Sequence, residues 1–144
     1  NRGASEARGL NIGLTISLPH EEFANEYVTR ELAFEFHYFF VRKFWFTYLA
    51  KAMIVMPGGF GTLDELFELL TLIQTLKIRK RLPVVLFGSD YWDRVVDFDV
   101  LVEYGTVDAD DLAMFHRTDS VDDAFEFVTR DLEEHALKDP GERL

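Results

Sequence analysis

Residues 52–66, AMIVMPGGFGTLDEL, decide how this chain is organised. The apolar run AMIVM has the length and composition of a strand that is buried on both faces of a parallel sheet. Three glycines and a proline follow, and an amphipathic run then predicts a helix from Thr62 to about Lys77. A strand therefore leads into a helix through a loop made almost entirely of backbone.

Strand and helix patterns alternate along the rest of the sequence. Apolar or alternating runs predict further strands over residues 10–18, 34–40, 81–88 and 115–119. Periodic segments predict helices over residues 1–9, 41–51, 91–105 and 107–115, and over 120–136 behind a Ser120 cap. This alternation predicts an α/β fold with a mainly parallel sheet. Ligands bind such sheets at the carboxyl ends of the strands, which is where the glycine loop lies.

The composition fits one domain of ordinary size. At 144 residues the chain can bury a single core, and we expect one domain over residues 1–144 whose tail, 136–144, frays. No apolar run reaches the roughly 18 residues that a membrane span requires, so no membrane partner is expected. The absence of cysteine agrees with a reducing compartment, and we expect the cytoplasm.

The charge of the chain argues against a nucleic-acid partner. Its formal net charge of -11 repels polyanions, and the only basic cluster, KIRKR at residues 77–81, is short. A small phosphate ester is still compatible with this charge, because local backbone donors can bind it.

The glycine loop has two interpretations. A glycine-rich loop that ends in a helix N-terminus can direct several N–H groups at one anion. Alternatively, Thr62 and Glu65 form a Thr-x-x-Glu capping box, which explains both residues without a ligand. The loop lacks the Gly-Lys-Ser/Thr ending of a Walker loop, and Asp64 replaces the third glycine of the dinucleotide fingerprint, so neither an NTPase nor a dehydrogenase is indicated.

The remaining polar residues carry weaker signals. Arg42 and Lys43 lie near the start of a predicted helix, where such a pair is commonly a solvated face. The four histidines have no metal-ligand spacing, so no metal site is predicted; they are His20, His37, His116 and His135.

Two motifs in register resemble the LOG (Lonely Guy) family, long described as lysine decarboxylase-like. Residues 57–65 match its PGGxGTxxE motif, and Arg42-Lys43 is similar to its Arg-Lys pair at the family spacing. The opening NRGASEARGL and the closing FHRTDSVDDAFEFV also resemble family segments. The family's first strands and its earlier glycine-rich loop have no counterpart in this sequence.

The resemblance implies a Rossmann-like, doubly wound fold and a homodimer that needs no cofactor. It also implies an enzyme that hydrolyses the N-glycosidic bond of a nucleoside 5′-monophosphate to free base and ribose 5-phosphate. Gly58, Gly59, Gly61 and Thr62 would hold the 5′-phosphate. Arg42 and Glu65 would be the catalytic pair, with Lys43 as an accessory.

The sequence leaves several alternatives open. The substrate is a cytokinin riboside monophosphate or an ordinary purine nucleotide such as AMP, and Arg42 either neutralises the phosphate or assists the departing base. The same loop could serve a nucleotide-binding module without catalysis. A pyridoxal phosphate-dependent decarboxylase requires a lysine for its aldimine, and no lysine of this chain stands out.

Overall fold

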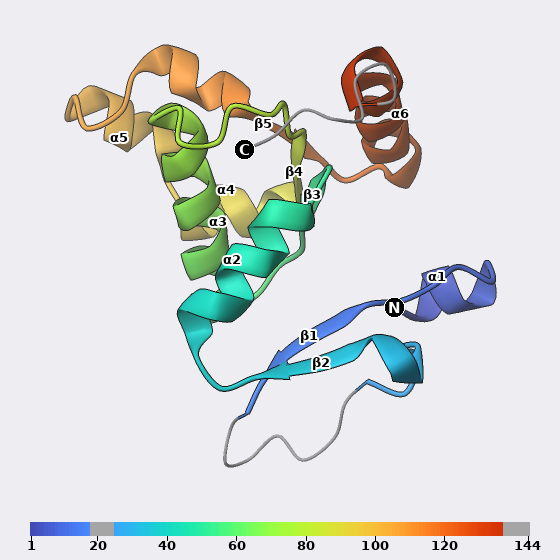
Figure 1. Ribbon diagram of the computed structural model, residues 1–144. Coiled ribbons are helices and arrows are strands. Elements are labelled where there is room, and N and C mark those ends of the chain that lie inside the picture. Colours follow the sequence, from blue (N-terminus) through green and yellow to red (C-terminus); the bar gives the residue numbers. More distant parts are fainter. Residues whose placement is uncertain (18–24, 137–144) are drawn as a thin grey trace. The chain divides into compact units, whose positions relative to one another are not determined.

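The computed structural model describes residues 1–17 and 25–136, so the predicted frayed tail lies mostly outside the described residues. The chain divides into two compact units, residues 1–49 and 50–144, and each is described by itself (Figure 1).

The first unit is built on a pair of parallel strands, β1 and β2, which are aligned from Gly13 opposite Ala33 to Ile16 opposite Phe36. Among the described residues of this unit, two helices and a 3-10 turn accompany the strands. Its elements are α1 (Arg2–Glu6), β1 (Gly13–Ile16), η1 (Arg30–Leu32), β2 (Ala33–Phe36) and α2 (Phe39–Leu49).

The strand predicted over residues 34–40 is wrong at its C-terminal end. β2 stops at Phe36, and α2 already begins at Phe39, two residues before the predicted helix start. The density of aromatic residues suggested a long strand, but the same aromatic run continues through the helix. Several of these side chains are largely exposed on α2, among them Phe40 and Phe44.

The second unit contains three parallel strands in the order β3-β4-β5, and helices connect them. The alternation confirms the predicted α/β class with parallel strands, consistent with a Rossmann-like fold. The five described strands form two separate sheets. The elements of the second unit are β3 (Met53–Val55), α3 (Phe60–Gln74), β4 (Val84–Phe87), α4 (Ser89–Val95), α5 (Phe98–Glu103), η2 (Ala109–Met114), β5 (Phe115–Thr118), α6 (Val121–Asp131) and η3 (Leu132–Ala136).

Helices cover both faces of the three-stranded sheet. Neighbouring residues of a strand point to opposite faces. Arg117 of β5 pairs with Asp93 of α4 at 2.8 Å, whereas the adjacent His116 reaches Asp123 of α6 at 2.6 Å. Figure 1 likewise shows α3 and α6 on opposite sides of β4. The second unit therefore has the doubly wound arrangement that the sequence predicts.

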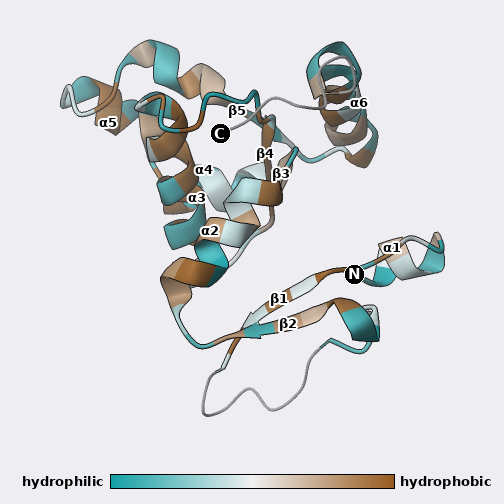
Figure 2. Cartoon of the chain, viewed as in Figure 1, coloured by the Kyte–Doolittle hydropathy of each residue, from teal (hydrophilic) through white to brown (hydrophobic). Residues whose placement is uncertain are grey.

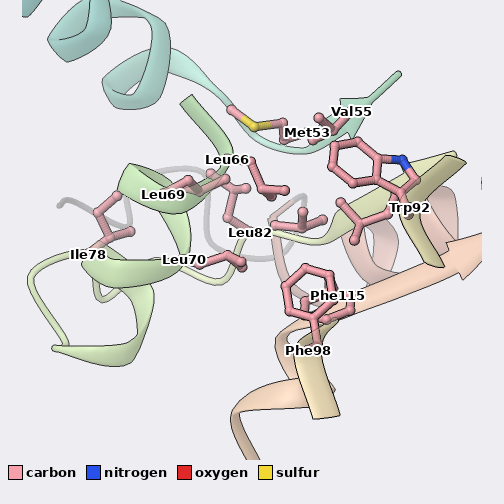
Figure 3. Close-up of a cluster of buried hydrophobic side chains, with 12 residues drawn as sticks. Met53, Val55, Leu66, Leu69, Leu70, Ile78, Leu82, Trp92, Phe98 and Phe115 are labelled. Atoms are coloured by element: carbon pink, nitrogen blue, oxygen red, sulfur yellow. The ribbon is translucent and has the colours of Figure 1, made fainter. Parts of the chain in front are cut away.

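The core of the second unit lies between the sheet and helices α3 to α5 (Figure 3). Leu66, Leu69 and Trp92 have no exposed surface, and neither do the central strand residues Val84 and Leu86. Burying side chains of this size stabilises a fold by about 1.5–3 kcal/mol each. β4 is hydrophobic throughout, whereas α6 carries both polar and apolar residues (Figure 2). A strand that is apolar on both faces is what a covered parallel sheet requires.

The helix predicted over residues 91–105 is two helices. α4 ends at Val95, and Asp97 caps α5 by accepting a hydrogen bond from the Val100 amide at 3.1 Å. An aspartate that accepts from the amide three residues on favours a new helix start over continuation of the old helix. The predicted Ser120 cap of α6 is confirmed, since its hydroxyl accepts from the Asp123 amide.

Candidate functional site

The glycine loop joins the carboxyl end of β3 to the amino end of α3. The helix begins at Phe60 with Gly59 as its N-cap, two residues before the predicted start. Thr62 is therefore the third residue inside the helix, and the N-cap of α3, a glycine, has no side chain that could cap it. The capping-box interpretation of Thr62 and Glu65 is wrong, because a residue in the first turn cannot serve as the N-cap.

The first turn of α3 begins with backbone donors, and its glycine N-cap has no side chain to accept from them. Leu63 donates to the Gly59 carbonyl at 3.1 Å, which is the first hydrogen bond of the helix. The amides of Phe60, Gly61 and Thr62 precede it and have no intrahelical acceptor. In a helix of 15 residues, these N–H groups lie at the positive end of the helix dipole. The loop thus offers the donor set that an anion at a helix N-terminus requires.

The loop is held by residues that follow β4. Pro57 packs against Gly88, where an added Cβ would lie 3.1 Å from the proline Cγ. Gly88 has a φ of 95°, a left-handed conformation that favours glycine. The Tyr91 hydroxyl donates a hydrogen bond to the Gly58 carbonyl. The carboxyl ends of β3 and β4 therefore meet at the glycine loop.

Thr62 and Glu65 follow the loop on α3. The Thr62 side chain lies directly against Gly58, where a Cβ would collide with its hydroxyl, so this position tolerates only glycine without a local shift. Glu65 is half-buried and lies three residues after Thr62. Residues at this spacing are neighbours on one helix face, and helical side chains tilt toward the N-terminus. Gly58, Thr62 and Glu65 are thus arranged in succession from the loop along one side of α3.

Arg42 and Lys43 lie on α2 of the first unit and are half-buried. The Arg42 guanidinium carbon is 5.9 Å from the centre of the Phe39 ring, a cation–π distance. The structure describes each unit by itself, so it brings together the loop residues, Thr62 and Glu65, whereas Arg42 and Lys43 are placed only within α2.

A cavity of about 640 Å³ lies at the amino ends of β4 and β5, the end of the sheet opposite to the glycine loop. Arg79, Lys80 and Arg81 line it together with Asp131, which accepts a hydrogen bond from the Arg81 Nε at 2.7 Å. Burial lowers the pKa of the Lys80 ammonium, and the positive charge of Lys51 lowers it further. The basic cluster of the sequence is therefore part of a cavity wall.

Within residues 1–17 and 25–136, no three histidine, aspartate or glutamate side chains form a group that could hold a metal ion. His116 instead stacks on Phe127 at 4.6 Å between ring centres and binds Asp123. In the same part of the chain, no helix combines the length and apolar character needed to cross a membrane.

The sequence does not reveal the residues that support the loop. Tyr91, Gly88 and Asp119, whose carboxylate accepts from the Ser89 amide at 2.7 Å, gather at the carboxyl ends of β4 and β5. The only available signal was the rule that functional groups collect where parallel strands end.

The chain was compared with models of protein families. Residues 1–128 match the family model described as "Possible lysine decarboxylase". No curated protein matches the chain.

Proposed function

We propose that this chain, which belongs to the LOG family of the "Possible lysine decarboxylase" model, hydrolyses the N-glycosidic bond of a nucleoside 5′-monophosphate. Water adds to C1′ of the ribose, the bond to the base nitrogen breaks, and the base leaves with a proton. The products are the free base and ribose 5-phosphate. The candidate substrates are AMP and its N6-modified cytokinin relatives.

The observation that carries this proposal is the N-terminus of α3 directly after the PGG loop, where the N-cap is a glycine without a side chain. Gly58 and Gly59 leave the backbone accessible, and the amides of residues 60–62 lack intrahelical acceptors. A phosphate dianion would satisfy these donors and interact favourably with the helix dipole. The 5′-phosphate would thus anchor the nucleotide, and Thr62 would add its hydroxyl.

Glu65 supplies the carboxylate for the reaction. Cleavage of a glycosidic bond develops positive charge on the ribose ring, which a nearby carboxylate stabilises, and a carboxylate can also activate water. Because Glu65 lies about one helical turn beyond Thr62, it would serve the sugar and not the phosphate. This placement also limits repulsion between the carboxylate and the bound anion.

Arg42 supplies a positive charge to the same reaction, with Lys43 as an accessory. The guanidinium would either neutralise the 5′-phosphate or assist the departing base. Comparing AMP with adenosine separates the two roles in the Arg42→Ala variant. A phosphate role makes the loss specific to AMP, whereas a leaving-group role lowers the rate on both substrates.

The direct test is release of free base from AMP and from N6-modified AMP by the full-length protein. Glu65→Gln should lower kcat by about 10²- to 10⁴-fold, the usual effect of removing an acid–base or charge-stabilising group. Glu68→Gln, nearly one turn further along α3, is the matched control and should retain activity. Normal turnover by Glu65→Gln would refute the assignment of this carboxylate.

The same assay distinguishes hydrolysis from nucleotide binding alone. A binding module without catalysis would be stabilised by AMP yet release no base after long incubation. The family resemblance also implies a homodimer, which analytical ultracentrifugation of the full-length protein measures directly.

A pyridoxal phosphate enzyme is supported by one observation, the buried Lys80 beside the 640 Å³ cavity. A lysine with a lowered pKa is a better amine nucleophile. However, this cavity lies at the opposite end of the sheet from the glycine loop. Titration with pyridoxal phosphate should give a near-visible absorption band that Lys80→Met abolishes; without such a band this function is excluded.

A further inference from the structure

Tyr91 connects α4 to the glycine loop across 33 residues of sequence. Its hydroxyl donates a hydrogen bond to the Gly58 carbonyl, and the side chain is half-buried. The Tyr91 ring packs edge-on against Trp92 with 5.1 Å between ring centres, and Trp92 is fully buried. The phenol is therefore supported by the core of the second unit.

The start of α4 is itself attached to the ends of two strands. The Gly88 amide donates to the Thr118 carbonyl at 3.0 Å, and the Ser89 amide donates to the Asp119 carboxylate at 2.7 Å. The Tyr91 amide donates to the Gly88 carbonyl at 3.1 Å. These contacts fix the backbone from which the Tyr91 side chain reaches the loop.

The geometry of a peptide bond gives this contact a consequence for the ligand side of the loop. In a trans peptide the C=O and N–H groups point in opposite directions. When Tyr91 holds the Gly58 carbonyl, the Gly59 N–H must point away from Tyr91. A peptide between two glycines can otherwise rotate easily, because neither residue has a Cβ. Rotation would turn a carbonyl oxygen, which repels anions, to the side where the N–H should be.

We propose that Tyr91 is a positioning residue that orients the Gly58–Gly59 peptide so that the Gly59 N–H joins the donors of the α3 N-terminus. Tyr91 does not touch the ligand. It acts through the peptide, and its effect is confined to ligands that place an anion at the loop. The inference rests on the proposed function only in taking that anion to be a nucleotide 5′-phosphate.

The experiment compares Tyr91→Phe with Tyr104→Phe in the full-length protein. Both variants remove one phenolic oxygen, but Tyr104 is 81% exposed at the end of α5. Dissociation constants are measured for AMP, inorganic phosphate and adenosine, together with urea midpoints to verify folding. Tyr91→Phe should raise the dissociation constants for AMP and phosphate by about 3- to 10-fold, the effect expected from the loss of one hydrogen bond. The dissociation constant for adenosine should stay unchanged.

Base release adds a readout that a merely structural role would not give. Tyr91→Phe should raise KM for AMP by a similar factor with kcat nearly unchanged, because the phosphate is bound in both the ground and the transition state. If the protein binds AMP but releases no base, the proposed hydrolysis is refuted. The difference in AMP affinity between the two tyrosine variants would still decide whether Tyr91 orients the loop peptide.

Equal affinities of the two variants for AMP would overturn the role of Tyr91. The same conclusion follows if Tyr91→Phe lowers the affinities for AMP and adenosine equally, since the effect would then not act through the phosphate. A wild-type protein that binds neither AMP nor phosphate would overturn both this inference and the phosphate site itself.

Discussion

The two compact units differ in how completely each buries its own apolar side chains. In the second unit, the core side chains of α3 and β4 are buried, and Leu69 and Val84 have no exposed surface. In the first unit, α2 leaves large apolar residues such as Phe40 and Leu49 mostly exposed, and Thr47 is its buried residue. The unit that carries the glycine loop therefore has the more complete core, whereas the unit that carries Arg42 has an apolar helix face.

The largest expected effect tests this difference with one substitution made in each unit. Leu69→Ala should lower the free energy of unfolding by about 2–5 kcal/mol, because it leaves a cavity in a fully buried site. Leu49→Ala, at a position that is 57% exposed, should change it by less than about 0.5 kcal/mol. Urea unfolding measures both free energies. Equal losses would contradict the difference in burial between the two units.

A second pair of variants tests how the glycine loop is fixed within the second unit. Gly88 and Gly105 both have positive φ, so alanine at either site should cost about 1–2 kcal/mol. Only at Gly88 does the added Cβ meet Pro57, whereas Gly105 faces open space. Thermal unfolding should therefore show a larger loss for Gly88→Ala, and Gly88→Ala alone should weaken AMP binding. Equal losses with equal AMP affinity would show that Gly88 does not support the loop.

A smaller effect is expected at the break between α4 and α5. Asp97→Ala removes the cap of α5 and should lower the free energy of unfolding by about 1 kcal/mol. Asp99→Ala, in the first turn of the same helix, keeps that cap and is the control. If both variants have the same urea midpoint, the cap does not explain why the helix is interrupted.

The smallest effect is a pH dependence on the α6 side of the sheet. The hydrogen bond with His116, followed by one with Thr118, lowers the pKa of the Asp123 carboxyl below its ordinary 3.8. The stabilisation is therefore complete above pH 3.8 and is lost as the pH falls through the lower pKa of the folded state. The measurement is the free energy of unfolding as a function of pH in the acid range. Below pH 3.8 it should fall less steeply for Asp123→Asn than for the wild type, while Asp122→Asn should retain the wild-type slope.

Local sequence signals predicted the strands of the second unit well. The apolar runs at β3 and β4 and the Ser120 cap of α6 depend on neighbouring residues alone, and the structure confirms them. The start of α3 was misjudged because Thr62 and Glu65 imitate a capping box. Glycine is normally unfavourable in the interior of a helix. Gly61 nevertheless belongs to α3, because it lies in the first turn, where its amide has no intrahelical acceptor.

The supports of the candidate site could not be predicted in this way. The contacts of Gly58 with Tyr91, of Pro57 with Gly88 and of Ser89 with Asp119 join residues about 30 positions apart. Such pairs become visible only when the parallel strands are aligned, because register sets which strand ends are adjacent. Motif spacing predicts Arg42 and Glu65 as candidate site residues, but it carries no information on how the loop peptide is oriented.

Our main proposal is that Arg42 and Glu65 both act in the hydrolysis of a nucleoside 5′-monophosphate. A double-mutant cycle on kcat/KM for base release from AMP tests it most directly, with Arg42→Ala, Glu65→Gln and the combined variant in the full-length protein. When two residues act together in catalysis, the effects of substituting them are strongly non-additive. We expect the double variant to be about as slow as the slower single variant. Losses that simply multiply, or a Glu65→Gln protein with wild-type turnover, would contradict it.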